Sequence, residues 1–183
     1  MNRTTYYTAT TLDGFIADEA ATLDWLLTQD IDQKGPLNYD DFIANVGAAV
    51  MGSVTYEWVL EQEAGKWSYD IPVWVMTSRA DERTKVDGDV RFASGDIRPV
   101  HAAMAEAAGG KDLWVVGGGE LAGLFADAGL LDEVVVSIAP VTLGRGAPLL
   151  PRVTDLHLEE LAQNGAFACA RYSVTRPAAA PSA

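Results

Sequence analysis

The sequence has few of the residues that metal and disulfide sites require. Among its 183 residues there is one cysteine, Cys169, which excludes an intrachain disulfide and a cysteine-cluster metal site. The two histidines, His101 and His157, are far apart in the sequence, and no pattern of further ligands surrounds either of them. Because local zinc sites need clustered ligands, we interpret both histidines as surface or structural residues and predict no metal.

Positive charge is also scarce. Lys and Arg number 13 against 26 Asp and Glu, a formal net charge of −13 at pH 7. Nucleic acids and anionic membrane surfaces both bind concentrated Lys and Arg, so we expect neither as a partner. No apolar run approaches the roughly 20 residues that span a bilayer, and the first ten residues lack the apolar core of a secretory signal. Together with the single cysteine, these features favour a cytoplasmic protein.

Strand and helix patterns alternate along the chain. Strands are predicted over Thr4 to Thr11, Ala48 to Met51, Ile71 to Thr77, Asp89 to Phe92, Leu113 to Val116, Glu133 to Ala139 and Phe167 to Thr175. Helices are predicted over VTYEWVLEQ after Ser53, from Pro99 to Ala108 and from Leu121 to Ala128. This order predicts an α/β fold with a mostly parallel central sheet. We expect one domain over residues 1–176, followed by a disordered Pro- and Ala-rich tail over residues 177–183.

Three predicted strand ends carry residues suited to phosphate. Gly117, Gly118 and Gly119 join a strand to a helix, where free N–H groups and the helix dipole favour an anion. Gly52-Ser53-Val54-Thr55 forms a second junction of this kind, and Thr77-Ser78-Arg79 ends another strand in two hydroxyls and a cation. Each junction alone could equally be an ordinary turn or helix cap. Together they indicate one sheet edge lined by a nucleotide.

A Rossmann dehydrogenase is the alternative that the glycine spacing raises. Gly117, Gly119 and Gly123 give the pattern G-x-G-x-x-x-G. The Rossmann fingerprint, however, belongs on the first βα unit of its domain, with an acidic residue about 20 residues further on. Too little chain follows residue 117 for such a domain, so this alternative is disfavoured.

Several sequence blocks occur in the order typical of one family. They are TATTLDGFIAD near the start, DWL at Asp24 to Leu26, VMGSVTYEW at Val50 to Trp58, VWVMTSR at Val73 to Arg79, and the long block from Leu113 to Pro151. On these blocks the chain resembles the dihydrofolate reductase-like superfamily, and within it stand-alone bacterial proteins similar to the riboflavin-biosynthesis reductase domain, the RibD C-terminal domain. The resemblance implies helices around the sheet, a C-terminal antiparallel strand or hairpin, and an NADPH-dependent reductase that often forms homodimers.

By matching position, the resemblance also implies the cofactor-binding residues. Those at the nicotinamide are Ala9, Ile16 and Ala17, with Asp13 and Gly14 in a loop that closes over it. Those at the pyrophosphate and adenosine phosphate are Gly52, Ser53 and Thr55. Those at the adenosine ribose and its 2′-phosphate are Thr77, Ser78 and Arg79. Those around the diphosphate are Gly117, Gly118, Gly119, Glu120 and Leu121.

One position departs from the family pattern. Relatives commonly carry Arg directly after the glycine of the MG block, where this chain has Ser53. A planar cation that clamps phosphate is therefore missing, although Arg79 could compensate. We expect NADPH as the cofactor, with NADH possible because selectivity for the 2′-phosphate is weakened.

The catalytic side of the site is less defined by the sequence. Hydride transfer needs proximity and alignment, and an acid only where the substrate is an imine or a carbonyl. Asp24 stands near the position where folate reductases keep a substrate-binding carboxylate, but it fits a solvated carboxylate in a first helical turn equally well. We predict a reductase of a small heterocyclic or carbonyl substrate. A non-catalytic nucleotide-binding or dimeric structural protein on the same fold is the alternative.

Overall fold

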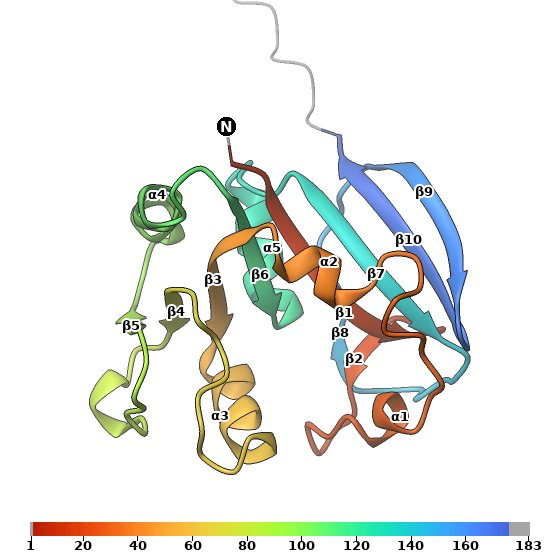
Figure 1. The fold of residues 1–183 in the computed structure, drawn as a ribbon, viewed down its shortest axis with the longest axis horizontal. Helices are drawn as coiled ribbons and strands as arrows, with labels where there is room; N and C mark the ends of the chain where they lie inside the picture. The colour runs from red at the N-terminus through yellow and green to blue at the C-terminus, as the bar shows by residue number, and fades with distance from the viewer. Residues whose placement is uncertain (1, 176–183) are drawn as a thin grey trace, which may run out of the picture.

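A central eight-stranded sheet organises the computed structural model, which describes residues 2–175. Figure 1 shows its strands in the order β5-β4-β3-β6-β1-β7-β10-β9. The strands from β5 to β7 pair in parallel, whereas β10 and β9 are antiparallel. Their bounds are β1 Thr4–Thr11, β3 Val46–Gly52, β4 Val73–Met76, β5 Val90–Ala93, β6 Asp112–Gly117, β7 Glu133–Ala139, β9 Leu156–Asn164 and β10 Phe167–Val174. A small second sheet pairs β2 Phe15–Ala17 with β8 Ala147–Pro148.

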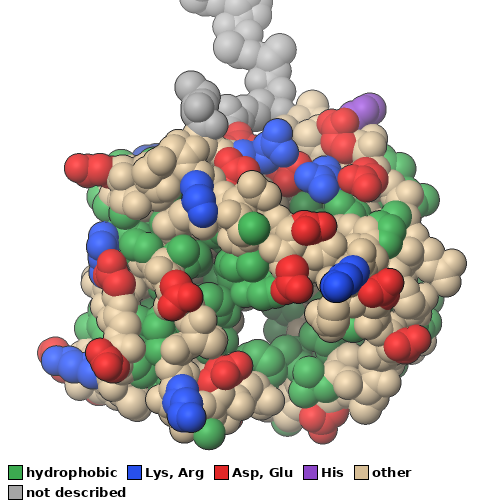
Figure 2. All heavy atoms as spheres, in the orientation of Figure 1, with side chains coloured by type: hydrophobic (Ala, Val, Ile, Leu, Met, Phe, Trp, Pro, Cys, Tyr) green, Lys and Arg blue, Asp and Glu red, His purple; other side chains and the backbone are tan. Residues whose placement is uncertain are grey.

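Helices cover both faces of the large sheet. α4 Ile97–Ala107 and α5 Gly119–Asp127 pack on one face. The other face carries α3 Ser53–Gln62 and two short helices, α1 Asp24–Leu27 and α2 Tyr39–Ile43. In the orientation of Figure 1, Figure 2 shows the molecule hollowed between the α3 side and the α1 side, with hydrophobic side chains around the hollow. Among residues 2–175, no helix is long and apolar enough to cross a membrane.

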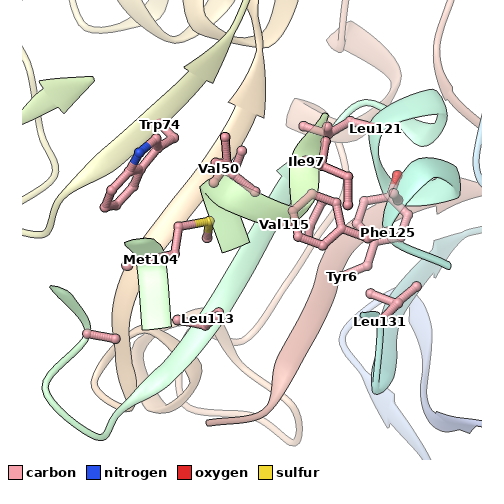
Figure 3. Close-up of a cluster of buried hydrophobic side chains, with 14 of the residues drawn as sticks. Tyr6, Val50, Trp74, Ile97, Met104, Leu113, Val115, Leu121, Phe125 and Leu131 are labelled. Carbon is pink, nitrogen blue, oxygen red and sulfur yellow. The ribbon is translucent and has the colours of Figure 1, made fainter. Parts of the chain in front are cut away.

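Successive side chains of β1 point to opposite faces of the sheet, so the hydrophobic core is divided into a layer on each face. Tyr6 is fully buried on the face of α4 and α5, whereas Tyr7 packs with the side chains on the opposite face. Figure 3 shows Tyr6, Val50, Leu113 and Val115 from the sheet beside Ile97, Met104, Leu121 and Phe125 from the helices.

The predicted α/β fold with a mostly parallel centre is confirmed, as is the C-terminal antiparallel hairpin, β9–β10. Two helices begin two residues earlier than predicted: α5 begins at Gly119 and not at Leu121, and α4 begins at Ile97 and not at Pro99. For α4 the cause is Asp96, whose side chain caps the helix by accepting a hydrogen bond from the Arg98 N–H. Strand β9 was not predicted. Residues 177–183 lie outside the described part of the chain, so the predicted tail stays a prediction.

The segment around β8 is held close to the start of α5. The Tyr6 hydroxyl donates a hydrogen bond to the Leu149 carbonyl oxygen at 3.1 Å, which ties this segment to β1. On the helix side, a Cβ atom at Gly119 would overlap the carbonyl oxygens of Pro148 and Leu149. Glycine is therefore required where α5 begins, because only the absence of a side chain permits this approach.

We predict that Gly119→Ala lowers the free energy of unfolding by about 1–3 kcal/mol, the usual cost of overpacking. The overlapping atoms belong to the backbone, which cannot rotate away as a side chain could. Urea unfolding of the variant and the wild type measures this difference. Gly52→Ala is the control, because a Cβ there would lie 3.8 Å from its nearest neighbour. Equal stability of Gly119→Ala and Gly52→Ala would contradict the prediction.

Candidate functional site

The ends of β3 and β6 lie side by side at one edge of the sheet. Met51 of β3 pairs with Gly117 of β6, and Gly52 pairs with Met76 of β4. A Cβ atom at Gly52 would lie 3.8 Å from the Gly117 carbonyl oxygen, and one at Gly117 would lie 3.8 Å from the Thr55 hydroxyl. The parallel sheet thus brings together the three turns that the sequence predicts to bind phosphate, because the turn at Thr77 directly follows Met76.

Two helices begin at this edge. α3 follows Gly52 and α5 follows Gly118, and neither of these N-cap residues supplies a side-chain hydrogen bond. Neither glycine therefore caps the first N–H groups of its helix. Uncapped N–H groups at a helix N-terminus can bind an anion, and the positive end of the helix dipole adds to the attraction. Gly117 has φ +145°, a conformation that favours glycine, and the Gly117–Gly118 peptide bond is cis.

The remaining residues of the predicted diphosphate turn have different environments. The Leu121 side chain is buried in the core (Figure 3), so only its backbone is available for a contact with a ligand. Glu120 is exposed and forms an ion pair with Arg152, Oε2 to Nη2, at 3.1 Å. The side chains of Glu120 and Leu121 are thus used for surface and core contacts.

The turn after β4 is exposed. Thr77 accepts a hydrogen bond on its hydroxyl from the Arg79 N–H at 3.1 Å, and Ser78 and Arg79 are exposed. The Arg79 guanidinium lies 3.5 Å from the Glu82 carboxylate, in the 3₁₀ helix η1 Ala80–Glu82 that follows. A cation therefore stands at this turn as predicted, but it already has an anionic partner.

The loop predicted to close over the nicotinamide is a turn tied to a second loop. Gly14 has φ +84°, and its N–H bonds to the Thr11 carbonyl oxygen. The Asp13 carboxylate accepts hydrogen bonds from the Thr11 hydroxyl at 2.5 Å, from the Gly144 N–H at 2.7 Å and from the Leu143 N–H. The hydroxyl of Thr11, and after it the backbone N–H of Gly144, lower the pKa of Asp13.

The other predicted nicotinamide residues lie near this loop. Ile16 and Ala17 belong to β2, and Ala9 is half-buried on β1. A Cβ atom at Gly118 would lie 3.7 Å from Cδ1 of Ile16, so β2 reaches the glycine turn of β6. Asp24 is different. It is exposed at the first position of α1, and none of the contacts that join the glycine turns involves it.

A set of aromatic side chains, which sequence analysis did not identify, lies on the face that carries α2 and α3. Tyr7 stacks on Phe42 with ring centroids 4.2 Å apart. Trp114 has Tyr39 and Tyr69 on its edges, each with its ring centroid at 5.8 Å. These residues come from separate parts of the chain with no shared motif, so only the fold brings them together.

A cavity of about 370 Å³ lies at the opposite ends of the strands, away from the glycine turns. Glu133 is buried in its wall, and its carboxylate accepts hydrogen bonds from Arg3 at 3.0 Å and from Thr5 at 3.2 Å. Arg171 lies 3.7 Å from the same carboxylate. Glu133 thus binds both arginines of the cavity, Arg3 and Arg171, and these contacts link β7 to β10 and to the residue before β1. The sheet edge at Gly52 and Gly117 is therefore the better candidate for the functional site.

Comparison with known proteins agrees with this geometry. The family model described as the RibD C-terminal domain matches residues 4–169. The chain belongs to the RibD C-terminal domain family. The uncharacterized protein YwjB of Bacillus subtilis (strain 168) is 31% identical over 153 residues, which cover 84% of this chain and 85% of YwjB.

Two solved structures share this fold. A candidate riboflavin biosynthesis protein from Shewanella sp. PV-4 is 26% identical with a TM-score of 0.78, over 95% of this chain and 99% of its own. The dihydrofolate reductase of Enterococcus faecalis, complexed with NADP(H), is 16% identical with a TM-score of 0.56, over 95% of this chain and 97% of its own. The predicted dihydrofolate reductase-like, reductase-type fold is confirmed.

We predict that Asp13→Asn lowers the Tm at pH 7 and that this difference in Tm shrinks as the pH falls below 3.8. A carboxyl whose pKa is lowered on folding stabilises the native state above its ordinary pKa of 3.8. This stabilisation is lost as the pH falls through the lowered native value, so the two proteins should converge in acid. Thermal unfolding from pH 7 to pH 3 measures the effect. Glu106→Gln, an exposed acid on α4, controls for the lost charge, and a constant Tm difference for Asp13→Asn across this range would contradict the prediction.

Proposed function

We propose that the protein is an NAD(P)H-dependent reductase that transfers a hydride to a small heterocyclic or carbonyl substrate. The observation that carries this proposal is the meeting of two helix starts, those of α3 and α5, at the neighbouring glycines Gly52 and Gly117. Membership of the RibD C-terminal domain family supports it, as does the fold shared with a dihydrofolate reductase complexed with NADP(H).

The residues present fit a dinucleotide from end to end. Backbone N–H groups after Gly52 and Gly118 would hold the diphosphate, and the Thr55 hydroxyl beside Gly117 would donate to it. Arg79 would meet the 2′-phosphate where NADPH is bound. Ile16 and the half-buried Ala9 would place the nicotinamide against apolar surface and exclude water there. The bound cofactor supplies the hydride, and the protein contributes binding and alignment.

The aromatic side chains favour a planar heterocycle over a small carbonyl as the substrate. Tyr39 is 38% exposed and Tyr69 is half-buried, so both offer ring surface against which a flat molecule can stack. Burial raises the pKa of Tyr69, so its hydroxyl is protonated at neutral pH and can donate a hydrogen bond. Burial also raises the pKa of Tyr7 to about 12, but the Tyr7 hydroxyl already donates to the Leu37 carbonyl oxygen at 3.0 Å.

A proton donor is needed only where the substrate is an imine or a carbonyl. Asp24 is the residue that the family resemblance suggests for this role. Asp24 is exposed at the start of α1, where the helix dipole stabilises a solvated carboxylate. This position fits such a carboxylate better than it fits an acid in an enclosed site. If Asp24→Asn leaves kcat unchanged over the pH range, the residue has no catalytic role.

We predict that Gly52→Ala weakens dinucleotide binding about tenfold, a loss of about 1.4 kcal/mol, and lowers stability less than Gly119→Ala does. The added methyl group would stand where the diphosphate must approach the backbone, although it overlaps no protein atom. Thermal shift with NADPH and NADH measures binding, because a ligand at 100 times its Kd adds roughly 2.7 kcal/mol. Val54→Ala, an exposed position one residue after Ser53, should bind as the wild type does.

The same titration separates the proposal from its alternatives. If neither dinucleotide shifts the wild-type midpoint, the proposed cofactor site is wrong. If NADPH or NADH binds but no heterocyclic or carbonyl substrate oxidises it, the protein is a nucleotide-binding module on a reductase fold.

We also propose that a second copy of the chain pairs with the outer face of the β9–β10 hairpin. Three leucines of β9 are exposed: Leu156, Leu158 and Leu161. They alternate along the strand with polar and acidic residues, and a bulge interrupts this alternation between Leu158 and Leu161. Because the chain carries a net charge of −13, two copies repel one another through most surfaces. A face of leucines without carboxylates avoids this repulsion, and the same patch on two copies can pair about a two-fold axis.

We predict that Leu161→Glu converts a wild-type dimer to a monomer, because the new carboxylate would face the same carboxylate on the second copy. The variant should remain folded, because Leu161 is 67% exposed. Light scattering after size-exclusion chromatography gives the mass. Leu124→Glu adds the same charge at an exposed position on α5 and should leave the dimer intact. A monomeric wild type, or a dimeric Leu161→Glu, would overturn the proposed surface.

A further inference from the structure

The cations at the adenosine end of the proposed site already have carboxylate partners. Nη1 of Arg79 lies 3.5 Å from Oε2 of Glu82, and both side chains are 64% exposed. Arg83, the other cation of this loop, is largely buried and forms an ion pair with Glu57 of α3. The position after Gly52, the other candidate for a phosphate-binding cation, holds Ser53.

The charge of this loop opposes a second phosphate. Residues 77–83 carry two arginines and two acids, Asp81 and Glu82, and Glu57 adds a third carboxylate at Arg83. A ribose 2′-phosphate is a dianion near neutral pH. To bind Arg79 it would have to displace Glu82 and then remain close to the displaced carboxylate. A ribose with a free 2′-hydroxyl has neither cost, since it needs only a hydrogen bond.

We propose that Glu82 sets the nucleotide preference of this site, by holding Arg79 and by repelling the 2′-phosphate. The inference rests on the proposed function and adds a specificity-determining residue to it. Its consequence is that the wild-type protein binds NADH about as tightly as NADPH. An exposed ion pair contributes up to about 1 kcal/mol, so releasing Arg79 should strengthen NADPH binding about two- to fivefold.

The test is a comparison of Kd values for NADPH and NADH in the wild type and in Glu82→Gln, at low ionic strength. Glu82→Gln should tighten NADPH binding two- to fivefold and leave NADH binding within experimental error. Because exposed charges are screened by salt, the gain should shrink at high ionic strength. Asp81→Asn is the matched control, since it removes one charge from the same exposed loop without freeing Arg79.

A double-mutant cycle assigns the effect to the ion pair. In an Arg79→Ala background, Glu82→Gln should lose most of its effect on NADPH binding, because there is no guanidinium to release. An unchanged ratio of the two Kd values in Glu82→Gln overturns the inference, as does an equal gain in Asp81→Asn. If the wild type binds neither dinucleotide, the proposed function itself fails, and that result differs from binding with an unchanged ratio.

Discussion

Parallel pairing between β3 and β6 places Gly52 beside Gly117, and the rest of the candidate site depends on this pairing. Both strands end at the same edge, so the helices that follow them begin there together. An antiparallel pair would place the two turns at opposite ends of the sheet. The pairing of β3 with β4 then adds the turn at Thr77 to the same edge. Topology therefore assembles three weak phosphate signals into one surface.

The approach of the β8 segment to α5 fixes the other side of this surface. Gly119 allows backbone contact with Pro148 and Leu149, and Tyr6 holds Leu149 from the sheet. Because β8 pairs with β2, the same segment also positions Ile16 near Gly118. Glycine thus has two different roles in the GGG turn. Gly119 is required by packing, whereas Gly118 is the residue that the proposed function places against the diphosphate.

The sequence predicted those elements whose pattern lies within a short stretch of the chain. Strands β1 and β7 were predicted with their observed bounds, since dense β-branched and apolar runs end at clear turn residues. Strand β9 was missed because its exposed sequence, LHLEELAQN, lacks a sustained apolar run and becomes a strand by pairing with β10. The aromatic pairs of Trp114 with Tyr39 and Tyr69 were equally invisible. They depend on which side chains the fold brings together.

An acidic chain that binds an anionic cofactor must obtain its attraction from groups that do not appear in the net charge. Backbone N–H groups at two helix starts meet this requirement, because they attract phosphate without adding Lys or Arg. In the proposed site they would recognise the diphosphate, which NADH and NADPH share. Discrimination between the two must come from a side-chain cation at the 2′ position, and there Arg79 faces Glu82. The proposed site would therefore divide affinity and selectivity between different groups, and a change at one acidic residue would alter selectivity while the diphosphate stays bound.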